Sequence, residues 1–174
     1  MNTELELKLT KEHPSIFRGY GGDPRATGMA FGIECNNGWY GLISRLCKHI
    51  DGLVEWVNRI EPTAKFEVIA FQVKEKYGTL RFYVDFRFDP SLSPEIMNRV
   101  NSIMDRISGA IDFAEAMSGT ICEECGQPGE INRSETWMRC RCRSCAICEH
   151  METPNEETHN EEDNNKDSEK SGAD

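Results

Sequence analysis

The sequence predicts an α+β fold, in which a small antiparallel sheet packs with two amphipathic helices. Three patterns in its 174 residues support this prediction. Residues 80–88 alternate apolar and polar side chains, which is typical of a strand with one buried face. Residues 38–60 and 94–118 repeat apolar side chains at every third or fourth position, which is typical of helices with one buried stripe.

The first strand is expected near residues 30–35, where apolar side chains alternate with a glycine and a glutamate. The segment before it is polar and rich in glycine and proline, which indicates a short helical turn and a loop, with His13 at the surface. The helix over about residues 38–60 comes next. Pro62 ends this helix, because proline has no amide hydrogen to donate to the preceding turn.

The rest of the sheet is predicted to be a β-hairpin over residues 66–88. Residues 66–73 are almost all apolar, as in a central strand covered on both faces. Residues 80–88 form the alternating strand described above. Residues 74–79 connect the two strands, and Gly78 supplies the backbone freedom that a tight turn needs.

The second helix, over residues 94–118, carries sequence signals at both ends. Ser93 is a good helix cap, Pro94 suits the first helical position, and Glu95 favours the positive end of the helix dipole. Gly119 follows the last periodic residue and is a natural stop.

The acidic charge of the chain is concentrated near its end. The chain has 30 acidic and 20 basic residues, a net charge of −10. Residues 149–174 hold ten of the acidic and two of the basic residues, so they carry −8 and the preceding 148 residues carry −2. We therefore expect an α+β domain over residues 1–118, a cysteine-rich module over residues 119–150, and a disordered acidic tail over residues 151–174.

The chain shows no signal for membrane insertion or secretion. No apolar run approaches the roughly 20 residues that cross a bilayer, and the first residues are polar, unlike a secretory leader. These features predict a soluble protein of the cytoplasm.

Four cysteines carry the clearest chemistry, in two pairs: Cys122 with Cys125, and Cys142 with Cys145. Two cysteines separated by two residues can turn both sulfurs to one side of a tight turn, and a second pair completes a tetrahedron. In a reducing cytosol, the eight cysteines favour metal binding over disulfides. The spacing therefore predicts one structural zinc ion, because four protein ligands leave no coordination position for water.

The register of the second cysteine pair has alternatives. Cys140 is two residues before Cys142 and could replace it as a ligand, and Cys148 could replace Cys145. A second metal would need more well-placed ligands than the chain has left.

Two groups of polar side chains are candidates for a partner surface. Arginines around the second cysteine pair suit phosphate groups, although nearby glutamates offer them local partners. The end of the hairpin adds a dense set of cationic and aromatic residues, which forms either a solvated turn or a recognition surface. The candidate residues are Arg139, Arg141, Arg143, Lys74, Lys76, Tyr77 and Arg81.

Three segments carry a resemblance: GWYGLI at residues 38–43, QVKEKYGTLRFY at residues 72–83 and TICEECGQPG at residues 120–129. Together they resemble a group of small proteins from bacteriophages and bacteria. The resemblance implies the same fold and a metal site, and it carries no activity with it.

In similar proteins, the first cysteine pair is followed by a tryptophan and then by a cysteine and a histidine three residues apart. Aligned on Trp137, the resemblance places Cys142 at that cysteine and Cys145 at that histidine. It therefore implies the ligand choice made above, with cysteine replacing histidine, and leaves Cys140 and Cys148 as departures from the pattern.

The leading functional hypothesis is a non-enzymatic, zinc-binding accessory protein of phage or mobile-element type. It would bind a host or phage protein in the host cytoplasm, with the zinc module as a rigid part of the binding surface. The alternatives are a nucleic-acid-binding zinc ribbon and an enzyme whose site the sequence does not reveal. The sequence contains no nucleophile elbow, phosphate loop or dinucleotide fingerprint.

Overall fold

The computed structural model describes residues 1–133 and 137–152. The predicted disordered tail lies outside the described residues from residue 153 onward. The helices and strands follow in the order α1 (Thr3–Glu12), β1 (Ile33–Glu34), α2 (Tyr40–Ile60), β2 (Glu67–Lys76), β3 (Thr79–Arg87), α3 (Pro94–Ser118), β4 (Glu130–Ile131), β5 (Cys140–Arg141) and α4 (Arg143–Glu152). Short 3₁₀ turns occupy Gly28–Phe31, Asn37–Trp39 and Pro62–Ala64.

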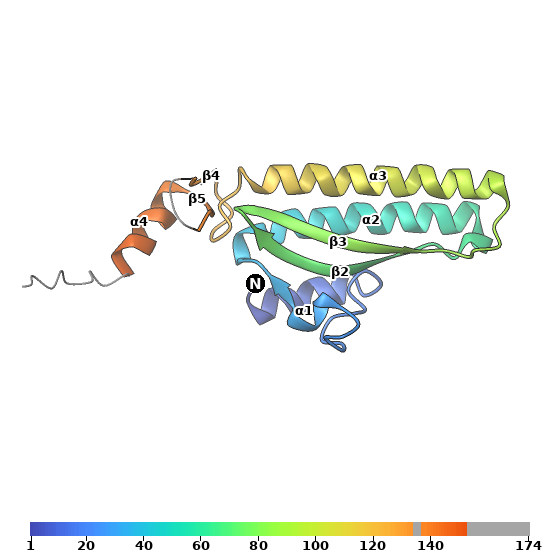
Figure 1. The fold of residues 1–174 in the computed structure, drawn as a ribbon, viewed down its shortest axis with the longest axis horizontal. Helices are drawn as coiled ribbons and strands as arrows, with labels where there is room; N and C mark the ends of the chain where they lie inside the picture. The colour runs from blue at the N-terminus through green and yellow to red at the C-terminus, as the bar shows by residue number, and fades with distance from the viewer. Residues whose placement is uncertain (134–136, 153–174) are drawn as a thin grey trace, which may run out of the picture.

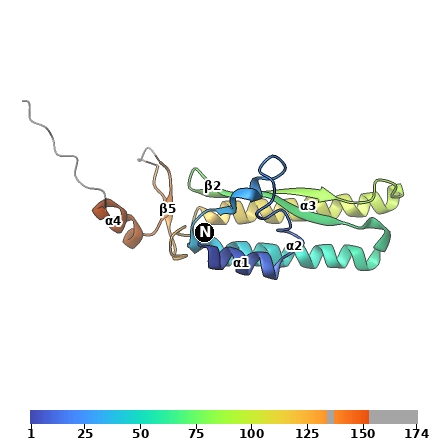
Figure 2. The same ribbon diagram turned by 90° about the horizontal axis from the view of Figure 1, so that it is seen from below.

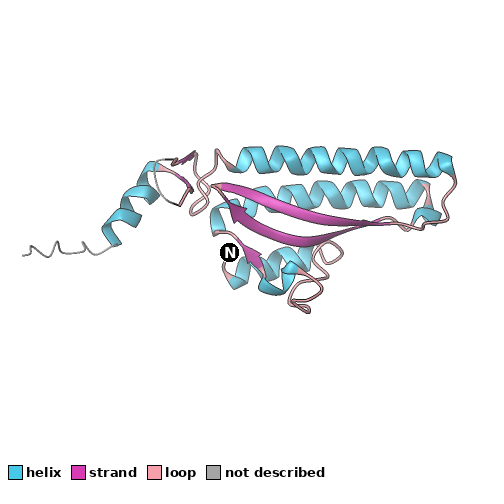
Figure 3. Cartoon of the chain, in the orientation of Figure 1, coloured by secondary structure: helices cyan, strands magenta, loops and turns pink. Residues whose placement is uncertain are grey.

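The predicted α+β fold is confirmed. Helices α2 and α3 lie side by side along the length of the β2–β3 hairpin (Figures 1 and 3). Both helices end where the sequence indicates: α2 at Ile60 before Pro62, and α3 at Ser118 before Gly119. The core lies between these helices and the hairpin, and its largest fully buried side chains include Trp39, Phe66, Phe82, Ile43, Ile50, Leu80, Ile107 and Val73.

The hairpin is antiparallel, as predicted, and its turn consists of Tyr77 and Gly78. Both residues have positive φ, 55° and 78°, which is the signature of a type I′ turn. This turn matches the right-handed twist of the strands and is closed by the pair Lys76 with Thr79. The register of the ladder shifts once, between Ala70 and Gln72.

The short first strand differs from the prediction in its direction. Strand β1 pairs with β2 in parallel, with Ile33 opposite Val73, so the sheet is mixed and ordered β1-β2-β3. The connection from β1 to β2 runs through α2, and such a helical crossover returns the chain in the same direction. Strand β2 is therefore the central strand, as its apolar sequence indicates.

Helix α1 was not predicted, because its sequence is mostly polar. It lies beside α2 (Figure 2), where the ammonium group of Lys8 is 5.2 Å from the ring centroid of Tyr40. The expected surface position of His13 is wrong. Its imidazole is buried after α1, with Nδ1 2.6 Å from Oδ2 of Asp51 on α2. The hydrogen bond to Asp51 satisfies the buried imidazole, so His13 can lie in the interior although the sequence around it is polar.

Helix α3 protects the free edge of the sheet. The amide of Leu80 on β3 donates to Oγ of Ser118 (2.8 Å), and the amide of Phe82 donates to Oε1 of Glu115 (2.8 Å). Unpaired edge amides would otherwise be left without partners in a buried position. These two bonds also tie the end of α3, where the cysteine-rich module begins, to the strand that leaves the hairpin turn.

We predict that Ser118→Ala destabilises the fold by about 1–3 kcal/mol, because it leaves the amide of buried Leu80 without an acceptor. The matched control is Ser108→Ala, an exposed position on the same helix, which should change stability little. Chemical denaturation of both variants and the parent measures the difference. Equal stability of the two variants would show that the Ser118 bond contributes nothing.

Candidate metal centre

The two cysteine pairs, distant in sequence, meet in the structure. The sulfur atoms of Cys122, Cys125, Cys142 and Cys145 all lie within 4.8 Å of one another. The sulfurs of Cys125 and Cys142 are 3.6 Å apart. This cluster can hold a metal ion, and it contains the four cysteines that the sequence spacing and the resemblance both select.

The first pair is shaped by a tight backbone turn. The amide of Cys122 donates to the carbonyl of Gln127 (2.7 Å), and the amide of Gly126 donates to the carbonyl of Cys122 (2.8 Å). Gly126 has a φ of 77°, a left-handed conformation that glycine adopts without a side-chain clash. The turn therefore directs the thiols of Cys122 and Cys125 to the same place.

The second pair lies at the start of α4, a helix that was not predicted. The amide of Cys145 donates to Sγ of Cys142 (3.5 Å), and the amide of Ala146 donates to the Cys142 carbonyl (3.0 Å). This position is favourable for thiolates, because the first turn of a helix presents free amides and the positive end of its dipole.

The thiol pKa values differ within the cluster as well as outside it, and desolvation raises the pKa of Cys145. The amide of Cys145 lowers the pKa of the Cys142 thiol to about 7, which favours the thiolate that binds metal. Burial raises the pKa of Cys140 to about 11 and that of Cys35 to about 12. Cys47 is likewise fully buried, with its pKa raised by desolvation. These three thiols fill the hydrophobic core.

The two alternative ligands lie outside the cluster. Cys140 on β5 is fully buried and packs into the hydrophobic core. Cys148 is exposed on α4, one helical turn beyond Cys145. Burial alone does not separate Cys140 from the ligands, since Cys122 is equally buried. Cys140 is set apart because its sulfur is not among the four that lie within 4.8 Å of one another.

A buried ion pair links strand β5 to the first cysteine turn. The guanidinium of Arg141 lies 3.2 Å from Oε2 of Glu123 and 3.6 Å from Oε2 of Glu124. The other carboxylate oxygen of Glu123 accepts a bond from the amide of Asn36 (2.9 Å). The side chains of Arg141 and Glu123 are only 8% and 6% exposed. Their charges therefore pair with each other inside the protein and do not face solvent.

Backbone contacts join the cysteine-rich module to the start of α2. The amide of Gly38 donates to the carbonyl of Glu123 (2.7 Å), and the indole Nε1 of Trp39 donates to the carbonyl of Ile121 (2.9 Å). A Cβ at Gly38 would stand 2.1 Å from the carbonyl oxygen of Cys122 and 2.5 Å from the amide nitrogen of Gly126. Only glycine fits there, so the module and the α+β domain are in direct backbone contact.

The hairpin turn is a further contact of the module. A Cβ at Gly78 would lie 2.9 Å from Cγ2 of Ile131, and a Cβ at Gly119 would lie 3.2 Å from Cδ1 of the same residue. Ile131 on β4 therefore packs between the tip of the hairpin and the end of α3. In Figure 1, β4 and β5 accordingly lie next to the end of the hairpin.

The residues predicted for a partner surface differ in their exposure and in their internal partners. Arg141 is held by the two glutamates, and Arg81 lies 3.7 Å from Oε2 of Glu115 and donates to the hydroxyl of Thr79 (2.7 Å). Both arginines therefore have internal partners. The others are distributed as half-buried Lys74 and Arg139 and exposed Lys76, Tyr77 and Arg143.

Trp137 is a surface residue that the functional prediction missed. Its side chain is 65% exposed, and it lines the same hollow as Lys74, Lys76 and Tyr77. The sequence contained one signal for it, a large aromatic residue in an otherwise polar loop, but tryptophan is usually assigned to a core.

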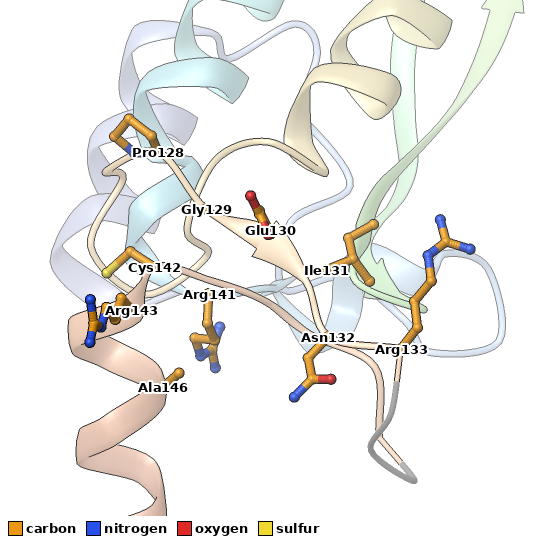
Figure 4. Close-up of a pocket in the computed structure, with 10 residues that line it drawn as sticks. All are labelled: Pro128, Gly129, Glu130, Ile131, Asn132, Arg133, Arg141, Cys142, Arg143 and Ala146. Carbon is orange, nitrogen blue, oxygen red and sulfur yellow. The ribbon is translucent and has the colours of Figure 1, made fainter.

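A second hollow, of about 690 Å³, lies within the module between the β4–β5 ribbon and α4. Figure 4 shows Arg133 and Arg143 at opposite sides of it, with Glu130 and Arg141 between them. The hollow is therefore mixed in charge.

Comparison of the chain with known protein families, curated proteins and solved structures finds no match. Among the helices of residues 1–133 and 137–152, none combines the length and apolar character needed to cross a membrane.

We predict that Gly38→Ala destabilises the protein by about 3 kcal/mol, because the new methyl group would overlap backbone atoms of the first cysteine pair. The control is Gly41→Ala in α2, where a Cβ meets nothing within 4 Å and should stabilise by up to about 1 kcal/mol. Denaturation curves measure the stability of both variants. The rate of thiol modification by a chromogenic reagent measures the accessibility of their cysteines. Parent-like stability of Gly38→Ala would contradict the backbone contact.

Proposed function

We propose that the protein is a zinc-binding, non-enzymatic accessory protein of phage or mobile-element type, which acts by binding another protein. The observation that carries the proposal is the four-cysteine cluster in a module joined to the α+β domain by backbone contacts. A metal at this place would fix a surface and would not create a reaction site.

Zinc is the metal that best suits these ligands. Thiolate sets of this kind select soft metals, and a tetrahedral arrangement of four sulfurs is typical of zinc or iron–sulfur sites. Zinc–sulfur bonds of about 2.3 Å place the sulfurs of a tetrahedron about 3.8 Å apart. The separation of 3.6 Å between the sulfurs of Cys125 and Cys142 agrees with this geometry. Cys122, Cys125, Cys142 and Cys145 would hold the ion.

A structural role follows from the number and origin of the ligands. Four thiolates fill a tetrahedral coordination sphere, so no position remains for water or substrate. Two of the ligands come from the turn after α3 and two from the start of α4. Zinc would therefore tie together the two ends of the module, whose own β4–β5 ribbon has only two residues in each strand.

A protein partner fits the charges better than a nucleic acid. Arg81 and Arg141, two of the arginines predicted for a partner surface, have carboxylate partners within the protein. A polyanion such as DNA or RNA binds mainly through uncompensated cations, and these two arginines are compensated.

One observation favours a second candidate, a nucleic-acid-binding zinc ribbon. Arg133 and Arg143 are exposed at the hollow shown in Figure 4, and guanidinium groups at such a place can contact phosphates.

We predict one tightly bound zinc per chain, lost in Cys125→Ser and retained in Cys148→Ser. Both cysteines are exposed, so neither change disturbs core packing, and only Cys125 belongs to the cluster. Elemental analysis of the purified proteins gives the stoichiometry, and thermal unfolding should show lower stability for Cys125→Ser alone. Zinc retained in Cys125→Ser, or absent from the parent, would contradict the proposed site.

We predict that the immobilised protein retains a discrete polypeptide from an extract of the cells in which it is naturally made. Retention should survive nuclease treatment and about 0.3 M salt, because short-range contacts resist the screening that weakens phosphate binding. The recovered polypeptide, once purified, should bind the protein in calorimetry.

The nuclease-treated sample distinguishes the two candidates. If nuclease releases everything that the protein retains, and Arg133→Gln with Arg143→Gln abolishes retention, the nucleic-acid candidate replaces the first. If the untreated extract yields neither a polypeptide nor a nucleic acid, the binding function is wrong.

A further inference from the structure

A hollow of about 490 Å³ separates the hairpin tip from the loop before β5. Two aromatic side chains border it from different segments: Tyr77, 62% exposed, from the turn, and Trp137, 65% exposed, from the loop. Lys74, Lys76 and neighbouring Glu75 and Met138 complete its lining. Its volume is in the range of about 300–1,000 Å³ that is usual for ligand pockets, so it can take one or two large side chains.

Folding does not explain the presence of Tyr77. Its φ of 55° lies in the left-handed region, where asparagine and glycine are favoured and bulky residues are rare. A buried aromatic ring could offset this strain by packing, but the Tyr77 ring is mostly exposed. Strained backbone that packing does not offset is a recurrent feature of binding sites.

The charge of the hollow is positive. Glu75 is committed to the turn, because its Oε1 accepts the amide of Gly78 at 2.6 Å. The ammonium group of Lys76 lies 5.3 Å from the centroid of the Tyr77 ring. Within residues 1–133 and 137–152, neither Lys74 nor Lys76 has a carboxylate partner at ion-pair distance.

We propose that this hollow binds an acidic linear segment of the partner protein. A large apolar side chain of the segment enters between the rings of Tyr77 and Trp137, and flanking carboxylates pair with Lys74 and Lys76. The proposal rests on the proposed protein-binding function and names the kind of partner. Exposed tyrosine and tryptophan are the side chains that most often anchor such contacts, because they bury a large area for little conformational entropy.

Charge complementarity selects this occupant over two others. A nucleic acid could stack its bases on the rings, but its affinity depends on neutralising several phosphates, and the described lining of the hollow offers two lysines. A short segment with one or two carboxylates is matched by these two cations. The acidic residues 153–174 of this chain contain no aromatic or large aliphatic side chain to serve as the anchor.

The test is a selection from a random dodecapeptide display library against the full-length, zinc-loaded protein. Enriched peptides should contain a large apolar residue beside Asp or Glu, and should bind with a dissociation constant of about 1–100 μM, as short linear segments with few anchors do. Tyr77→Asn suits the turn and should unfold no earlier than the parent, yet it should weaken binding at least about tenfold.

Matched variants assign the contacts. Trp137→Ala should weaken binding, whereas Phe113→Ala, which removes an equally exposed ring from α3, should not. Lys74→Gln with Lys76→Gln should weaken binding, and the loss should shrink as salt is raised. Lys48→Gln, an exposed lysine on α2, is the control for charge.

Three results would overturn the proposal: no enrichment above a parallel selection against Tyr77→Asn, enriched peptides without acidic residues, or oligothymidylate binding to the hollow more tightly than the peptides. The proposed function fails separately. If a polypeptide captured from extract binds the parent and Tyr77→Asn equally, the protein-binding function stands and the hollow is not its site.

Discussion

The contact between Gly38 and the first cysteine turn is the constraint on which the rest of the structure depends. The two backbones touch there, and a Cβ at Gly38 would stand 2.1 Å from the carbonyl oxygen of Cys122. Trp39, fully buried in the core, bonds the carbonyl just before Cys122. The first cysteine turn, which follows the end of α3, is thereby fixed against the start of α2. The same contact brings together the GWY and CxxCG segments, which lie about 80 residues apart in the sequence.

The contact between Gly38 and the cysteine turn also determines which residues surround the hairpin tip. Once the cysteine turn is seated on α2, Ile131 packs against Gly78 and Gly119, and the loop that bears Trp137 is brought to the tip. The distance between Trp137 and Tyr77 therefore depends on both ends of the module being tied together. A metal in the four-cysteine cluster would act on this surface indirectly, through the position of the β4–β5 ribbon.

Sequence periodicity predicted the hairpin and the two long helices because each buries one continuous apolar stripe. It could not reveal α1, whose only fully buried side chain is Leu9, or α4, which begins within the second cysteine pair. The parallel direction of β1 is set by the α2 crossover and not by its own two residues. Cysteine spacing selected the four cluster residues, but it could not exclude Cys140, whose burial depends on tertiary packing. The sequence also overstated the number of arginines that could contact a partner, because it could not show that Arg141 pairs with Glu123 and Glu124 of the first cysteine turn.

The placement of charge suggests why the surface would be selective. Glu123 and Glu124 neutralise Arg141 beside the cluster, and Glu115 neutralises Arg81 along the edge of β3. Glu75, the carboxylate nearest the aromatic rings, is turned inward to the Gly78 amide. Two lysines thus lie next to two exposed rings. This local pair of cations favours a ligand that combines one apolar anchor with a few carboxylates at a fixed spacing. Among the described residues that line the hollow, an extended polyanion finds no further cation for its remaining phosphates.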